Sequence, residues 1–342
     1  MTRAPGPPPV LPHDDQARNP RGPGRTLAAW IAGLLLAGVS AVMGCRIADV
    51  DGVTPVPQLL AFLPWLLAPT GAALLLTALA RWRIGMVWGV AVLGALAWYI
   101  EPYGKDLKDA EASGLPVAEV RVLASNVQFG RGTESLVSAV RRERPGLVFV
   151  EECDYGCQDT LRRELPRADF PYRQAVEAGG SQGSVILSRY PLKATAGVPG
   201  TMGMPGAVAD VKGHAVRLQL AHPMPPLPRQ VGLWRSELGR LRDFAAAGRS
   251  QPTILAGDFN ATQDHAAFRR ILDAGLHDST RLAGNSRAPS WPSRAPAPLG
   301  AQIDHVLVSE EFSPRSARFV QLADTDHRAL LVDLTFHRPP TS

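Results

Sequence analysis

Three long stretches without a single charged residue occupy the first hundred residues and constrain the fold more than any other feature. They cover residues 26–45, 53–80 and 84–100 and are 20, 28 and 17 residues long. A helix that crosses a bilayer needs about 20 apolar residues, whereas a helix of a soluble core carries a polar face. We therefore predict three transmembrane helices over residues 26–100, the second of them kinked at Pro64 and Pro69.

A cleaved signal peptide is the alternative for the first stretch, because residues 42–45 resemble a lipoprotein cleavage site. The stretch is longer than the usual apolar region of about 7–15 residues, and two more stretches follow it. Positive charge then predicts the orientation, since cytoplasmic loops are enriched in Lys and Arg. Arg25 precedes the first helix, and Arg81 and Arg83 separate the second from the third. We expect a multi-pass protein of the cell membrane with residues 101–342 outside the cytoplasm.

Composition divides the chain into four parts. We predict a disordered, Pro- and Arg-rich cytoplasmic tail at 1–25, the helices at 26–100, a linker at 101–116 and a catalytic domain at 117–338. Residues 1–100 hold 7 of the 36 Lys and Arg residues and 4 of the 31 Asp and Glu residues. The remainder therefore carries a net charge of only +2, which disfavours a nucleic-acid-binding protein.

Beyond residue 117, alternating strand and helix patterns predict an α/β domain. Apolar and polar residues alternate with period two from Val120 to Val127, and apolar residues recur at helical spacing from Val231 to Ala245. The Pro-, Ala- and Ser-rich segment 284–300 reads as a loop. The patterns predict helices at 133–142 and 231–245 and strands at 120–127, 147–152, 183–189, 215–222, 253–257, 302–309 and 328–334.

Polar and ionisable side chains gather at the ends of six predicted strands. Any one of them alone is as well explained by a turn cap or a satisfied polar group. Six together indicate a functional site at one edge of the sheets. The residues concerned are Asn126, Glu152, His222, Asp258 with Asn260, Asp304, and Asp326 with His327.

This set suits metal-assisted hydrolysis of a phosphoryl group. Mg²⁺ prefers one or two carboxylates plus waters, and Glu152 is the leading ligand because an acid at the end of an apolar strand needs a charge partner. Mn²⁺ is the alternative ion. Asp258 can orient the attacking water. Asp304 can be the carboxylate partner that orients the imidazole of His327. His222 and Asn260 can donate hydrogen bonds to the phosphoryl oxygens.

Short motifs along residues 117–336 resemble the endonuclease/exonuclease/phosphatase superfamily, the magnesium-dependent enzymes that include DNase I and sphingomyelinases. Each motif is weak alone, but their order and their positions on strands are specific. The motifs are Ser125-Asn126, Glu151-Glu152, the strand 183–189, His222-Pro223, the segment 257–262, the segment 303–307 and Thr325-Asp326-His327.

The resemblance implies a four-layer α/β/β/α sandwich behind the membrane helices. It also implies a role for each candidate residue. Asn126 and Glu152 would hold the metal with Asp326 nearby, His222 and Asn260 would bind phosphate, Asp258 would position water, and Asp304–His327 would serve as base or phosphate ligand.

Two positions depart from the family pattern. Glu151 stands where Gln commonly precedes the metal-binding Glu, and Thr325 replaces a common Ser. Because neighbouring residues on a strand face opposite ways, we predict that Glu152 rather than Glu151 binds the metal. The three-helix start also resembles the actinobacterial glycopeptide-resistance (VanJ-type) membrane phosphatases, which implies antibiotic resistance through a lipid pyrophosphate.

The substrate expected on these grounds is a membrane lipid, with the bilayer itself as the other partner; the sequence names no protein partner. The function is then a lipid (polyprenyl) pyrophosphate phosphatase or phosphodiesterase. The alternative enzymes are a membrane-tethered nuclease and a sphingomyelinase-like phosphodiesterase. A membrane module without enzymatic activity is the third alternative. Residues 179–183 match a serine-hydrolase G-x-S-x-G pattern, but a strand rather than a helix is predicted after it. Cys153 and Cys157 can form a disulfide in an oxidising compartment.

Overall fold

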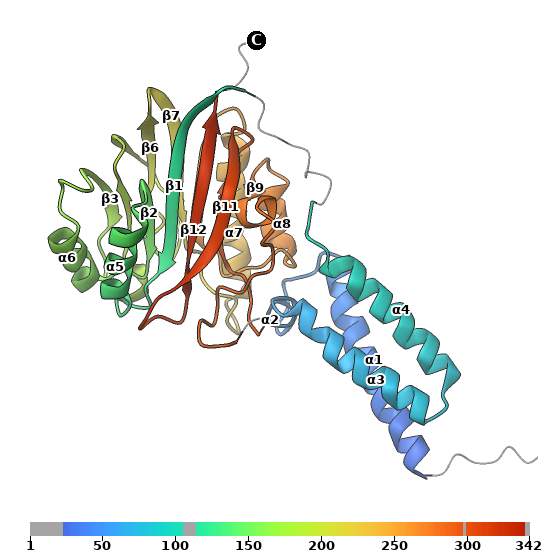
Figure 1. Ribbon diagram of the computed structural model, residues 1–342. Helices are drawn as coiled ribbons and strands as arrows, with labels where there is room; N and C mark the ends of the chain where they lie inside the picture. Colours follow the sequence, from blue (N-terminus) through green and yellow to red (C-terminus); the bar gives the residue numbers. More distant parts are fainter. Residues whose placement is uncertain (1–22, 105–113, 297–298, 339–342) are drawn as a thin grey trace, which may run out of the picture.

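The computed structural model describes residues 23–104, 114–296 and 299–338. The predicted tail up to residue 22 and the linker residues 105–113 lie outside this described part. Two six-stranded sheets pack face to face, with the strand orders β11-β12-β1-β2-β4-β3 and β5-β6-β7-β8-β10-β9 (Figure 1). The strands are β1 (Pro116–Asn126), β2 (Leu147–Glu151), β3 (Tyr172–Val176), β4 (Ser184–Ser188), β5 (Leu192–Thr195), β6 (Gly206–Val211), β7 (His214–Ala221), β8 (Thr253–Asp258), β9 (His277–Asp278), β10 (Asp304–Val308), β11 (Phe312–Gln321) and β12 (Arg328–His337).

The core lies between the two sheets. Alternate residues of β1, among them Val120 and Val122, meet Leu218 and Leu220 of β7 in one buried apolar cluster. The outer face of the first sheet is covered by α5 (Thr133–Glu143) and α6 (Tyr155–Glu164), and that of the second by α7 (Val231–Ala247) and α8 (Ala266–Leu272). This arrangement confirms the predicted α/β two-sheet sandwich.

Several elements escaped the sequence patterns: α6, α8, the short α9 (Ser279–Leu282) and five strands, β3, β5, β6, β9 and β11. β3 and β5 lie at sheet edges and most of their residues are half-buried or exposed, so they lack the clean alternation of a half-buried strand. The predicted loop at 284–300 holds no helix and only an isolated bridge between Trp291 and Ala301 in its described residues.

The second apolar stretch does not form the single kinked helix that we predicted. It divides into α2 (Val56–Leu60), the 3₁₀ helix η1 (Leu63–Leu66) and α3 (Leu67–Leu79). Pro64 lies in the first turn of η1, where a missing N–H costs nothing, and Pro69 lies in the first turn of α3 and ends no helix. The chain therefore turns sharply over residues 56–62 before it enters a shorter apolar helix.

Three helices, α1 (Pro23–Ile47), α3 and α4 (Arg83–Ile100), pack into a bundle that projects from one end of the sandwich (Figure 1). α1 and α4 are long and apolar enough to cross a membrane, whereas η1 and α3 together span only Leu63–Leu79. Of the residues in their apolar windows, 28% in α1 and 22% in α4 are buried within the protein. Most of their apolar surface therefore faces outward, unlike that of a soluble core helix.

Polar contacts fasten the bundle to the sandwich. The buried carboxylate of Asp51, just after α1, accepts a 2.7 Å hydrogen bond from the Ala267 amide of α8 and pairs with Arg235 of α7 at 3.0 Å. Arg287 donates 2.7 Å from its Nε to the Ile100 carbonyl at the end of α4. These contacts fix the bundle against the second sheet's helices, so the linker is not the only connection.

Candidate active site

The site lies at the sandwich edge where parallel strands end. β1 and β2 run parallel in the first sheet, and β7 and β8 run parallel in the second. Their carboxyl ends therefore meet at one edge of the sandwich. That edge faces α2 and the helical bundle (Figure 1).

Asn126 and Glu152 come together at the ends of β1 and β2. Asn126 is the last residue of β1, and Glu152 follows β2 with a left-handed backbone, φ 55°. The Asn126 amide donates to Glu152 Oε1 at 3.1 Å, and the Phe129 amide donates to Glu152 Oε2 at 3.0 Å. The left-handed residue turns the Glu152 carboxylate out of the sheet and toward the cavity at this edge.

The second sheet contributes His222, Asp258 and Asp304. His222 follows β7, Asp258 ends β8, and Asp304 begins β10 directly opposite Asp258. Asn126 also donates to Asp258 Oδ2 at 3.2 Å, so one amide bridges the two sheets. His222 Nε2 lies 3.8 Å from Glu152 Oε1 and 4.0 Å from Asp258 Oδ2.

His327 completes the group from the start of β12. Its Nδ1 lies 2.9 Å from Asp304 Oδ2, the carboxylate–imidazole pair that the sequence predicts, and its Nε2 lies 3.8 Å from Asp258 Oδ2. Asp326 Oδ1 is 4.0 Å from the same Nε2. Asn260 sits after β8, where its backbone amide donates to Asp258 Oδ1 at 2.8 Å and its side chain to the Pro223 carbonyl at 3.1 Å. All eight predicted residues thus meet at one place; their roles remain predictions.

Burial and mutual charge set the protonation of this group. Burial, with a smaller contribution from the charge of His327, lowers the pKa of His222 to about 3 and keeps that imidazole neutral. Burial raises the pKa of Asp258 to about 7, although His327 opposes the shift. Burial lowers the pKa of His327, but the charges of Asp304 and Asp258 outweigh it and raise that pKa to about 10.

Two residues near the site are not among the predicted site residues. Glu151 points inward, as strand alternation requires, and both of its carboxylate oxygens are buried without a hydrogen-bond partner among the described residues. Burial and the charges of Asp304 and Asp258 raise its pKa well above the usual range. Trp291, in the predicted loop, donates from its indole Nε1 to Asp326 Oδ2 at 3.0 Å. The pair of acids at 151–152 was the sequence signal for Glu151, whereas nothing in the sequence pointed to Trp291.

The G-x-S-x-G segment does not form a nucleophile elbow. Ser181 lies in the short 3₁₀ helix η3 (Gly180–Gln182), which precedes strand β4. An elbow has the opposite order, with the strand before and a helix after. Ser181 instead lines the cavity beside Glu152.

Comparison with known proteins identifies the family. A sequence model of the Endonuclease/Exonuclease/phosphatase family matches residues 123–327, more than half of the chain. This chain belongs to the endonuclease/exonuclease/phosphatase family. Members of the family hydrolyse phosphoester bonds and typically use a divalent metal ion. A search of the curated proteins finds no match.

Solved structures share the family's fold with this chain at low identity. Humanized D. rerio TDP2 has a TM-score of 0.52 at 16% identity, covering 64% of this chain and 99% of TDP2. An endonuclease/exonuclease/phosphatase from Beutenbergia cavernae has a TM-score of 0.52 at 18% identity, and the likeness covers 66% of this chain and 73% of that one. The catalytic domain of human Nocturnin, with a bound sulfate anion, has a TM-score of 0.51 at 17% identity, with 65% of this chain and 95% of that domain covered. In each case the likeness covers about two thirds of this chain.

The donor set fits the divalent ion that the family typically uses. Glu152, Asp258, Asp304 and Asp326 bring carboxylates to one edge, and Asp304 Oδ1 is buried without a hydrogen-bond partner among the described residues. Asp258, Asp304 and His327 each offer a ligand atom within 4.8 Å of the others. Such a concentration of oxygen ligands is what Mg²⁺ and Mn²⁺ bind. The ion would neutralise negative charge that the site's own cations leave unbalanced.

Proposed function

We propose that this protein is a metal-dependent phosphoryl hydrolase at the outer face of the cell membrane, acting on a lipid phosphate or pyrophosphate. Polyprenyl pyrophosphate is the substrate that we put first. One observation carries the proposal. A cavity of about 450 Å³ is lined by Glu152, His222, Asp258 and His327 and also by Pro57, Gln58, Ala61 and Phe62 of the helical region. The segment between the apolar helices α1 and α3 thus meets the catalytic edge directly, which a simple tether does not require.

Charge and cysteine chemistry support the outer location. The start of α1 and the α3–α4 connection lie at the end of the bundle far from the sandwich (Figure 1). They carry Arg25, Arg81 and Arg83, so the positive-inside rule favours an orientation with the sandwich on the opposite side of the membrane. Cys153 and Cys157 form a disulfide, which persists in oxidising compartments such as the cell exterior.

Each residue has a definite part in the proposed reaction. Asn126, Glu152 and Asp326 would hold the metal ion, which supplies a Lewis acid for the phosphoryl oxygen. Asp258 orients the attacking water and accepts its proton. Neutral His222 and the Asn260 amide donate hydrogen bonds to the phosphoryl group as charge builds up. Asp304 and His327 act as a pair, in which the Asp304 carboxylate orients the His327 imidazole.

The decisive experiment compares substrates on the full-length protein. Purified in detergent micelles with Mg²⁺, the protein should release phosphate from polyprenyl pyrophosphate, and an Asp258→Asn variant prepared alongside should not. Plasmid DNA, followed by strand cleavage on a gel, and sphingomyelin, followed by phosphocholine release, serve as the competing substrates under the same conditions. If DNA is cut far faster than the lipid, the protein is a tethered nuclease and the proposal is wrong.

A further inference from the structure

The cavity that holds the catalytic residues has a second, apolar part. Its walls come from three segments that lie far apart in the sequence. The turn over residues 57–62 provides one wall, residues 224–227 after β7 provide another, and Trp291 with Ile303 provides the third. Leu227 is 47% exposed and lines this cavity beside Met224, Pro225 and Pro226. The cavity therefore combines a site for a phosphoryl group with an adjoining apolar surface.

The turn at 57–62 is held against the catalytic domain by its own hydrogen bonds. Gln58 Nε2 donates to the Pro226 carbonyl, which belongs to the opposite wall. The Pro57 carbonyl lies 2.8 Å from Nε2 of the buried His265, whose other ring nitrogen faces the Thr262 amide at 2.9 Å. Because both contacts join the helical region to loops beside the catalytic strands, this wall is part of the site.

An aromatic pair connects the turn to the predicted metal ligands. The ring centroids of Phe62 and Trp291 lie 6.5 Å apart, with the planes tilted by 45°. The Trp291 indole at the same time donates to Asp326 at 3.0 Å. A group bound against the two rings would therefore lie beside Asp326, one of the predicted metal ligands.

We propose that Phe62 and Trp291, with Leu227 on the facing wall, bind the first segment of the apolar chain of the substrate, next to its phosphate. This inference rests on the proposed function, because it assigns the chain-binding part of the same site. The occupant is the alkyl or prenyl chain of a phosphate ester, since the phosphoryl residues and the apolar walls share one cavity. The turn at 57–62 also continues directly into η1 and α3, so the rest of the chain can follow apolar helices into the bilayer.

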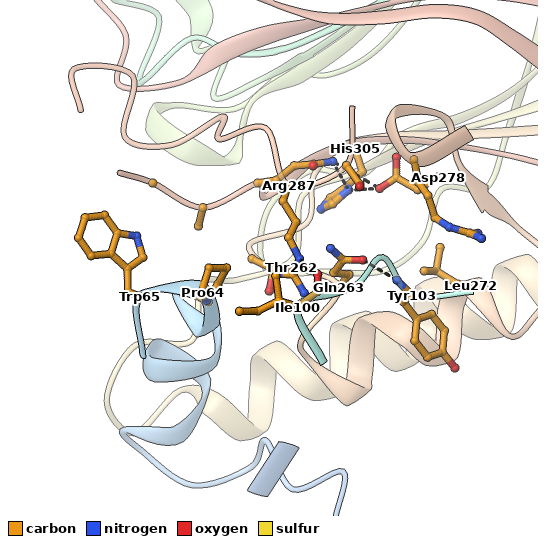
Figure 2. A pocket seen from close by; sticks show the side chains of 16 residues that line it. Pro64, Trp65, Ile100, Tyr103, Thr262, Gln263, Leu272, Asp278, Arg287 and His305 are labelled. Atoms are coloured by element: carbon orange, nitrogen blue, oxygen red, sulfur yellow. Dashed lines mark hydrogen bonds and ion pairs between the residues drawn. The ribbon is translucent and has the colours of Figure 1, made fainter. Parts of the chain in front are cut away.

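A smaller neighbouring cavity does not suit the chain. It has a volume of about 160 Å³ and lies between Pro64, Trp65 and Ile100 on one side and Asp278, Arg287 and His305 on the other (Figure 2). The polar groups on its sandwich side are already paired. His305 Nδ1 lies 2.7 Å from Asp278 Oδ2, and Arg287 forms two hydrogen bonds with Asp264. None of the eight predicted site residues lines it.

The test is a chain-length series on the full-length protein in detergent with Mg²⁺. Inorganic pyrophosphate and pyrophosphates that carry one and three isoprene units are compared by kcat/KM for phosphate release. Wild type should prefer the longer chains, and Phe62→Ala and Leu227→Ala should each reduce that preference about tenfold, a usual effect of reshaping an apolar pocket. Trp98→Ala is the matched control, because Trp98 is 77% exposed on α4 and lines no part of this cavity.

Trp291→Phe separates the two contacts of the indole. It keeps the aromatic surface and removes the hydrogen bond to Asp326. The chain-length preference should persist, while kcat falls for every substrate and more Mg²⁺ is needed for half-maximal rate. Trp291 acts on the metal through Asp326 and is therefore a positioning residue.

The outcomes distinguish a failure of this inference from a failure of the proposed function. A Tm of Phe62→Ala in detergent equal to that of wild type shows that the variant is folded. If wild type prefers long chains and Phe62→Ala and Leu227→Ala keep that preference, the chain lies elsewhere and the inference is wrong while the proposed function stands. If wild type releases no phosphate from any member of the series, the proposed function fails, and the inference fails with it.

Discussion

Glu152 holds its carboxylate at the cavity through hydrogen bonds from Asn126 and from the Phe129 amide. Three further carboxylates, of Asp258, Asp304 and Asp326, surround the same edge, so the site repels the ionisation of its own acids. Burial raises the pKa of Asp258 to about 7, and repulsion by the charge of Asp304 adds to the shift. A divalent cation would relieve it, which connects the protonation of single residues to the proposed chemistry.

Metal removal is the first expectation at this scale. A chelator should abolish phosphate release, and Mg²⁺ or Mn²⁺ should restore it, because the acids supply part of an open oxygen-ligand shell. Glu152→Gln should raise the Mg²⁺ concentration needed for half-maximal rate. The measurement is a metal titration of activity, with the exposed Glu177→Gln as control. Full turnover in chelator would exclude the mechanism.

Loss of the proton-transfer groups is the second. Asp258→Asn and His327→Ala should each lower kcat by at least about a hundredfold, the usual scale for a positioned acid or base. Asp243→Asn on α7, with a carboxylate 67% exposed and paired with Arg242, should leave kcat within about twofold, the scale of a surface substitution. Steady-state rates on one soluble pyrophosphate are sufficient for the comparison. A His327→Ala enzyme as active as wild type would remove His327 from the mechanism.

Among the elements, β2 ends at an acid and is followed by a second acid, and the two side chains lie in opposite directions. Glu151 faces inward toward Asp304 and Asp258 and keeps a raised pKa through burial and their charges, whereas Glu152 turns outward through a left-handed backbone. β8 passes close to β7 and to the buried acid: a Cβ at Gly257 would lie 2.2 Å from the Ala221 carbonyl oxygen and 2.7 Å from Glu151 Oε1. Gly257, with φ 142°, therefore makes room for a carboxyl group between the sheets.

The stability of the sandwich should consequently depend on pH through Glu151. A folded-state pKa above the ordinary 4.5 means that the folded protein binds more protons than the unfolded chain as pH rises above 4.5. Stability is then highest at low pH and declines as pH rises through the folded pKa. Glu151→Gln removes this decline, so its Tm should change less than that of wild type between about pH 5 and 8. Thermal unfolding in chelator measures the difference, and equal slopes for the two proteins would contradict the assignment.

The contact of Asp51 with α8 gives another expectation at the scale of elements. The Asp51 carboxylate satisfies the Ala267 amide, one of the free donors at the start of α8, from a position 216 residues earlier in the chain. Asp51→Ala leaves that buried amide without a partner and should lower the free energy of unfolding by about 1–3 kcal/mol. Thermal unfolding in detergent measures it, with Asp243→Ala as the exposed control. An unchanged Tm would show that the bundle is not fastened here.

At the scale of the whole molecule, the sandwich and α2 with the residues after it share one cavity, and the proposed orientation puts that cavity at the outer membrane surface. Protease added to intact cells should therefore cleave the region 114–338. Cys153 and Cys157 should react with an alkylating reagent only after reduction, because they form a disulfide. Mass spectrometry of labelled peptides from intact cells reads both results. Complete protection from the protease would place the sandwich in the cytoplasm.

The sequence by itself determined the sandwich, the apolar helices and the place of eight site residues. These features depend on local order: period-two alternation, charge-free stretches, and polar residues directly after apolar strands. Asn126, Glu152, His222 and Asp258 could be found because parallel strands carry their carboxyl ends to one edge. His327 reaches the same edge because it precedes β12, which runs antiparallel to β1.

Tertiary structure alone decided what surrounds those residues. The contact of Trp291 with Asp326, the approach of Phe62 to Trp291 and the docking of Asp51 on α8 join segments 35 to 229 positions apart. No periodicity encodes such pairs, because each depends on how finished elements pack against one another. The same reason explains the broken second helix, since the turn at 57–62 is held by residues of the catalytic domain. Packing between distant segments, and not local pattern, thus made the helical region a wall of the active site.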